Sequence, residues 1–195
     1  MAILLSTKPE WVAKICHEVG RTKDNIPIYE KRIEVRKGKP DKLPCKVYLY
    51  CTKITGLSIV DYAELHRLIN GKIDEWSGKV IGEFVCDNVM FLTPLGLRGF
   101  EVHPEILKAM CLTKEDLDTY GGLKTIYGWH ITDLKIYDKP KELSEFYRPC
   151  SYSGICYSCN RFRPNGTPND KPNDFCDGEI TRPPQSYMYV RELCE

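Results

Sequence analysis

The stretch EKRIEVRK at residues 30–37 alternates charged with apolar side chains. Successive side chains of a β-strand point to opposite faces, so Ile33 and Val35 would enter a core together. The opposite face would have to meet water, counter-charges or a ligand. That charged face carries Arg32, Glu34 and Arg36.

The side chains of this stretch have the chemistry to hold a polar ligand. Arg36 is a planar donor that can bind a phosphate or a base edge through two parallel hydrogen bonds. Lys31 donates hydrogen bonds or, when desolvated, acts as a base. Glu34 would orient the arginines on either side of it, or accept a hydrogen bond from the amino group of a base. We therefore predict a ligand-binding cleft, with a solvated strand carrying ordinary ion pairs as the alternative.

Two further groups of residues could complete such a cleft. Lys8 stands at the start of an expected helix, where N-terminal amides favour anions. Tyr120, Trp129 and His130 flank a glycine-rich turn and could stack on an unpaired base. Trp129 and His130 alternate along one strand, so we expect at most one of them to face the ligand. The alternative for Trp129 is packing in the core.

Four cysteines form a separate signal, in a segment rich in Pro, Gly, Asn and Asp that cannot build a core of its own. Their spacing is C-x5-C-x2-C followed by a gap of sixteen residues. Four thiolates around zinc would supply the missing folding free energy, so we predict a structural zinc site. An iron–sulfur cluster uses the same ligands, and four free thiols are the remaining alternative. The predicted ligands are Cys150, Cys156, Cys159 and Cys176.

Regular elements must position these residues. Runs rich in β-branched and aromatic side chains predict strands over 2–6, 46–52, 79–86, 128–138 and 184–190. A first helix is predicted after the first strand, where Thr7 and Glu10 have capping-box spacing. Further helices are predicted over 60–71 and, in two pieces, over 104–120, where Thr113 and Asp116 have the same spacing.

Short strands outnumber helices and are widely separated. This pattern is typical of an α+β fold, a small mixed β-barrel with flanking helices, more than of a βαβ series. We predict that the barrel comprises residues 1–145 and 181–195, with the cysteine-rich residues 146–180 as a metal-stabilised loop insertion.

Composition excludes several classes of function. The net charge of +1 gives no global attraction to nucleic acid, so any such binding needs a local patch. No secretory signal and no stretch of roughly 18 uninterrupted apolar residues is present, so we expect a cytoplasmic protein with no membrane partner. No Ser-His-Asp, P-loop or His-Glu-x-x-His pattern supports those enzyme classes.

Four segments together resemble the ASCH domain, a member of the PUA-like β-barrel superfamily: LLSTKPEWVAKI, EKRIEVRKGKP, VIGEFVCD and YGWHITDLKIYDKPKEL. The family carries a motif close to Gly-x-Lys-x-x-Glu-x-Arg. Lys31, Glu34 and Arg36 match its last three defined positions, and Tyr29 stands at the position of the glycine.

The resemblance implies a cleft between the first helix and the motif strand that faces a nucleotide or nucleic acid, RNA more than DNA. One branch of the family hydrolyses the amide of acetylated cytidine, using the motif lysine, a threonine three residues later and a downstream glutamate. Here Glu34 replaces that threonine, and Glu105 and Glu115 are candidates for the downstream acid. Binding is therefore the first hypothesis. A hydrolase with Lys31 and Glu34 as catalytic residues is the second, and an accessory factor with a protein partner is the third.

Overall fold

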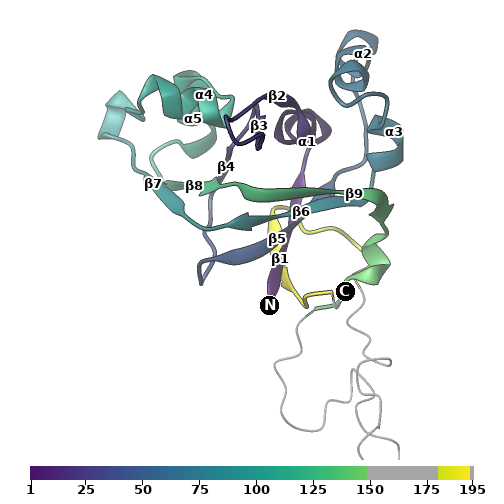
Figure 1. Ribbon diagram of the computed structural model, residues 1–195. Coiled ribbons are helices and arrows are strands. Elements are labelled where there is room, and N and C mark those ends of the chain that lie inside the picture. Colours follow the sequence, from purple (N-terminus) through teal and green to yellow (C-terminus); the bar gives the residue numbers. More distant parts are fainter. Residues whose placement is uncertain (149–179, 194–195) are drawn as a thin grey trace, which may run out of the picture.

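The computed structural model describes residues 1–148 and 180–193, and the four predicted metal ligands lie outside them. Runs of consecutive strands are separated by single helices or pairs of helices, as expected for an α+β fold (Figure 1). The strands are β1 (Ala2–Thr7), β2 (Glu18–Arg21), β3 (Pro27–Tyr29), β4 (Ile33–Arg36), β5 (Cys45–Cys51), β6 (Val80–Cys86), β7 (Val89–Leu92), β8 (Ile126–His130), β9 (Thr132–Lys141) and β10 (Tyr187–Val190). The helices are α1 (Pro9–Cys16), α2 (Ile59–Leu68), α3 (Ile73–Trp76), α4 (Pro104–Met110) and α5 (Lys114–Gly121), with short 3-10 turns at Gly96–Arg98 and Leu143–Glu145.

The strands form a central sheet of five strands in the order β10-β1-β5-β6-β9, a sheet of three in the order β4-β8-β7, and the hairpin β2-β3. In the central sheet β1 and β5 run parallel, while the other neighbours are antiparallel. The mixed α+β fold class is therefore confirmed. Closure of these sheets into one barrel stays a prediction.

Helices flank the sheets on one side of the molecule (Figure 1). In this view α4 and α5 lie to the left, α2 and α3 to the right, and α1 lies between them. None of the described helices is long and apolar enough to cross a membrane.

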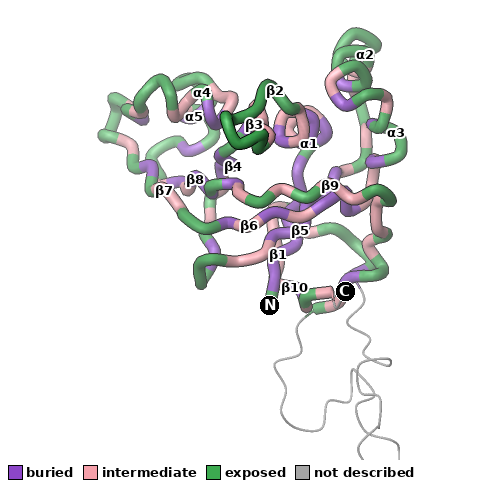
Figure 2. The backbone as a smooth tube through the Cα atoms, in the orientation of Figure 1, coloured by how far each residue is buried: buried purple, intermediate pink, exposed green. Residues whose placement is uncertain are grey.

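Side chains of β1 are buried on both faces of the central sheet (Figure 2). Ile3 and Leu5 join the cluster under α1, while Ala2 and Leu4 join a second cluster on the opposite face. A third cluster lies between the three-stranded sheet and the helices α4 and α5, and it contains Ile33 and Val35 as the alternation predicts.

The structure differs from the sequence-based expectation at two places near the motif strand. The strand predicted over 128–138 is two strands, because β8 pairs with β4 and β7 whereas β9 pairs with β6. The first helix begins at Pro9 after Lys8, with no capping bond from a side chain. Thr7 remains in β1, and its hydroxyl accepts a hydrogen bond from Arg36 at 3.0 Å.

The close pairing of β6 and β9 predicts that Gly82 does not tolerate a side chain. A Cβ atom at Gly82 would meet the backbone oxygen of Lys135, which cannot move without breaking the ladder. We expect Gly82→Ala to lower the free energy of unfolding by about 1–3 kcal/mol, measured by urea denaturation. Gly20→Ala is the matched control, since nothing lies near the added atom there. Equal effects of the two substitutions would contradict the prediction.

Candidate functional site

The motif strand is held by its backbone between two helices. The Lys31 amide donates to the Lys14 carbonyl in α1, and the Arg32 amide donates to the Ala109 carbonyl in α4. These bonds fix the entry to β4, so the side chains that follow have defined directions.

Three charged side chains of this stretch form one buried cluster. The Lys31, Glu34 and Arg36 side chains are only 2%, 6% and 11% exposed. Glu34 lies between the two cations: its Oε1 is 2.8 Å from Arg36 Nη2, and its Oε2 is 3.4 Å from Lys31 Nζ. The Lys31 ammonium donates to the Met110 carbonyl at 2.6 Å.

The cluster is also tied to β1 and α1. Arg36 donates to the carbonyl oxygen of Ser6 at 2.8 Å and to the hydroxyl of Thr7. The Lys31 ammonium lies 4.9 Å from the centre of the Trp11 ring, a cation–π contact. Of the predicted charged face, Glu34 and Arg36 are therefore largely shielded from solvent, whereas Arg32 is exposed.

Two polar atoms of the cluster have unused hydrogen-bonding capacity. Among the described residues, no hydrogen bond reaches Glu34 Oε2 or Arg36 Nε, although both atoms are buried. The 3.4 Å contact between Glu34 Oε2 and Lys31 is an ion pair without hydrogen-bond geometry. Buried polar atoms normally have partners, so an acceptor and a donor are left for a ligand or water.

A cavity of about 230 Å³ between α1, β4 and α5 is lined by Lys31 and Glu34 of this cluster, whereas Arg36 does not line it. Tyr120 gives it an aromatic wall that is 39% exposed, and the Lys37 ammonium lies 5.0 Å from the centre of that ring. Burial raises the pKa of the Tyr120 hydroxyl, so this group stays protonated at neutral pH. The lining residues are Trp11, Lys31, Glu34, Val35, Leu112, Asp116 and Tyr120.

Asp116 places a second carboxylate on the cavity wall. The sequence identifies it as a helix cap, and the structure confirms the capping box with Thr113. Hydrogen bonds from the Thr113 amide and hydroxyl lower the pKa of this carboxyl. Glu115, the adjacent acid considered in the sequence, is exposed and does not line the cavity, and the same holds for Glu105 in α4.

The structure does not bring the remaining predicted site residues to this cavity. Lys8 is exposed and lies 3.8 Å from Glu10. Arg32 is also exposed and borders two other hollows. Trp129 is fully buried, with its indole N–H donating to the Gly38 carbonyl at 3.0 Å, and His130 pairs with Asp87 at 2.8 Å.

Trp11 and Leu112 line the cavity without having been predicted as site residues. Trp11 follows the apolar spacing of α1, which is equally consistent with packing, and Leu112 has no distinguishing signal in the sequence. Within the described residues, no group of three or more His, Cys, Asp or Glu side chains could hold a metal ion. The zinc prediction concerns residues outside that range.

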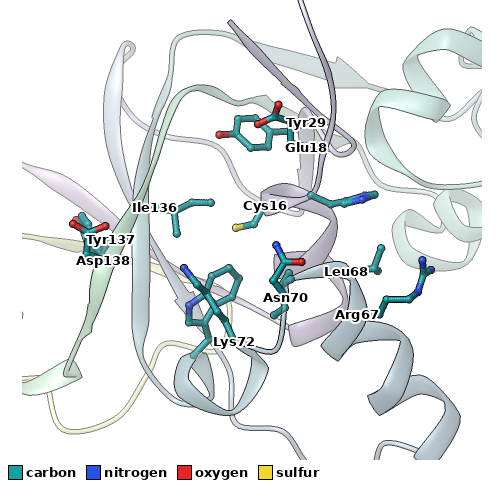
Figure 3. Close-up of a pocket in the computed structure, with 13 residues that line it drawn as sticks. Cys16, Glu18, Tyr29, Arg67, Leu68, Asn70, Lys72, Ile136, Tyr137 and Asp138 are labelled. Atoms are coloured by element: carbon teal, nitrogen blue, oxygen red, sulfur yellow. The ribbon is translucent and has the colours of Figure 1, made fainter.

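A larger cavity of about 490 Å³ lies at the C-terminal end of α1 and is also lined by residues of α2 and β9 (Figure 3). Cys16 points into it, while Tyr29 and Glu18 lie at one end and Lys72 and Asn70 at the other. Burial raises the pKa of the Cys16 thiol far above its usual range, so this thiol is not a nucleophile at neutral pH. The charged side chains that line this larger cavity do not form a buried cluster. The cavity of about 230 Å³ is therefore the stronger candidate site.

Because the cluster is buried, we expect the stability of the protein to be unusually sensitive to loss of its one carboxylate. Glu34→Gln removes the charge that compensates Lys31 and Arg36, so we expect the free energy of unfolding to fall by about 3 kcal/mol. Glu18→Gln is the control, because Glu18 pairs with Arg21 at an exposed site, where about 0–1 kcal/mol is expected. Denaturant titration of both variants gives the comparison. A loss for Glu34→Gln no larger than for Glu18→Gln would show that the charge of Glu34 does not stabilise the buried cluster.

Comparison with known proteins supports the fold. No family model and no curated protein matches the chain. A crystal structure of ASCH from Zymomonas mobilis is similar over 98% of this chain and 88% of that chain, with 14% identity and a TM-score of 0.50. Tyrosine-to-phenylalanine and serine-to-alanine variants of that protein match at 13% identity and a TM-score of 0.44, over 98% of this chain and 91% and 89% of theirs. The first of these likenesses, together with the described topology, shows that the chain has the fold of an ASCH domain.

Proposed function

We propose that the chain binds a nucleobase, as part of a nucleotide or of a single-stranded RNA, in the cavity between α1, β4 and α5. The observation that carries this proposal is the buried carboxylate of Glu34, a residue of the cavity lining, which has one oxygen that accepts no hydrogen bond within the described residues. A base with an exocyclic amino group supplies the missing donor, as cytosine does through its N4 amino group.

The size and the charges of the site agree with a single base. The volume of about 230 Å³ is smaller than pockets that enclose whole drug-sized ligands, so the sugar and phosphate would remain outside. Lys37 lies over the Tyr120 ring, and Lys14 lies 5.1 Å from the centre of the Trp11 ring. Ammonium groups at these positions would attract the phosphate of a bound nucleotide.

An aromatic wall supplies the second element of base recognition. Tyr120 is the more exposed ring of the cavity and is in contact with one ammonium group, that of Lys37, whereas the Trp11 ring is in contact with two. Stacking of a base on an aromatic ring contributes about 1–3 kcal/mol. Tyr120 would therefore provide affinity, and Glu34 would select bases that carry an amino group.

This proposal predicts a loss of binding when the aromatic wall is removed. Tyr120→Ala should weaken binding of a fluorescent oligocytidine about tenfold at low salt, because one stacking contact is lost. Leu123→Ala is the control, since Leu123 is exposed, follows the same helix and does not line the cavity. Fluorescence anisotropy measures both affinities.

The same titration tests base selection. Oligocytidine should bind more tightly than oligouridine, because only cytosine carries the amino donor for Glu34. Affinity should also fall with salt concentration. If the protein bound neither oligonucleotide nor cytidine monophosphate at low salt, the proposal would have to be abandoned.

A second function, hydrolysis of an acylated cytidine, is favoured by one observation. Lys31, Glu34 and Asp116 line the same cavity, and an amine with two carboxylates can supply general acid–base catalysis. Water would add to the amide carbon, the C–N bond would break, and the cytosine amino group would take up a proton.

Turnover is tested by incubating the protein with N4-acetylcytidine and following cytidine by chromatography. Hydrolysis predicts product formation above the buffer blank and its loss in Lys31→Met, which removes the ammonium but keeps a long side chain. Circular dichroism shows whether that variant folds, and Asp116→Asn provides a second test if it does not. Absence of product with the folded wild-type protein would leave binding as the only supported function.

A further inference from the structure

Two cysteines far from the cavity occupy directly opposed positions in the central sheet. Cys45 begins β5 and Cys86 ends β6, and the antiparallel register pairs these two residues. Opposed residues of an antiparallel pair have Cα atoms about 4.5–5.5 Å apart. A disulfide spans Cα atoms about 4.4–6.8 Å apart, so the backbone already has a suitable separation.

The two thiols differ in accessibility and acidity. Cys45 is partly exposed, whereas Cys86 is fully buried, and both are free. A hydrogen bond with Cys86 lowers the pKa of the Cys45 thiol. The same interaction and burial raise the pKa of Cys86. Cys45 is therefore the thiol that an oxidant reaches and that more readily forms a thiolate.

None of the remaining described cysteines lies opposite another cysteine in a pair of strands. Cys51 pairs with Thr7 across the sheet, and burial raises its pKa to about 12. Cys111 caps α4 outside any strand, and burial raises its pKa. Cys16 lies in α1. Within the described part of the chain, the opposed geometry is found for Cys45 and Cys86.

We propose that Cys45 and Cys86 form a reversible disulfide when the protein is exposed to a peroxide. The Cys45 thiolate attacks one peroxide oxygen, the O–O bond breaks, and a sulfenic acid and hydroxide are formed. The Cys86 sulfur then attacks Cys45 Sγ, the S–O bond breaks, and water leaves with the Cys86 proton. The two sulfurs lose two electrons in all, and the peroxide takes them up. A dithiol reverses the bond by exchange.

The Cys45–Cys86 disulfide would restrict the segment that connects the candidate site to the central sheet. Residues 37–44 lead from β4 to β5, and within them Lys37 contacts Tyr120 while the Gly38 carbonyl holds Trp129. Oxidation would link the end of this connection covalently to β6. Because the disulfide lowers the conformational entropy of the unfolded chain, the free energy of unfolding would rise.

Peptide mapping of the full-length protein tests the proposal. The reduced protein is treated with hydrogen peroxide, alkylated and digested with trypsin. We expect a linked pair of peptides, residues 43–46 joined to residues 80–98, that separates on treatment with dithiothreitol. Cys45→Ser should lose this species, and the control Cys111→Ser should keep it.

Two results would overturn the proposal. One is the absence of the linked peptides at a peroxide dose that oxidises Cys45. The other is a Cys45 peptide joined mainly to a different cysteine. Cys86→Ala provides an independent check, because Cys45 should then stop at the sulfenic acid, which dimedone traps. Failure of that trapping while the folded wild-type protein forms the link would also refute the proposed order of steps.

Discussion

The ion cluster of Lys31, Glu34 and Arg36 is the interaction on which the surrounding structure depends. One carboxylate compensates two cations at low exposure, and each cation is also bound to a backbone carbonyl of another element. Lys31 connects the motif strand to the end of α4, and Arg36 connects it to β1. Burial of such charges is costly unless partners are in place, so β1, β4 and α4 must be positioned together.

The same constraint explains why the site is a small cavity and not an open cleft. The cations are occupied by internal acceptors, while one carboxylate oxygen and one guanidinium nitrogen keep free capacity. A ligand would therefore meet a preorganised acceptor beside apolar and aromatic walls. Recognition by a few fixed polar groups in a mainly apolar pocket is the general pattern for small ligands.

Local sequence signals predicted local structure well, and long-range placement less well. The alternation in residues 30–37 correctly predicts that Ile33 and Val35 are buried, and the capping box predicted for α5 is present. The sequence does not reveal that β1 covers the charged face, because that contact joins distant segments. Trp129 lies directly opposite Glu34 in the register and packs in the core, a placement that depends on the partner strand and not on its own neighbours.

The pairing of β1 with β10 has a consequence for the order of folding. Ala2 pairs with Val190, so β1 acquires this neighbour only after the residues up to β10 have been synthesised. Until then β1 can be paired only with β5, and its other edge stays open to other strands. Contacts this far apart in sequence slow folding, so newly made chains would carry an unprotected, strongly apolar edge.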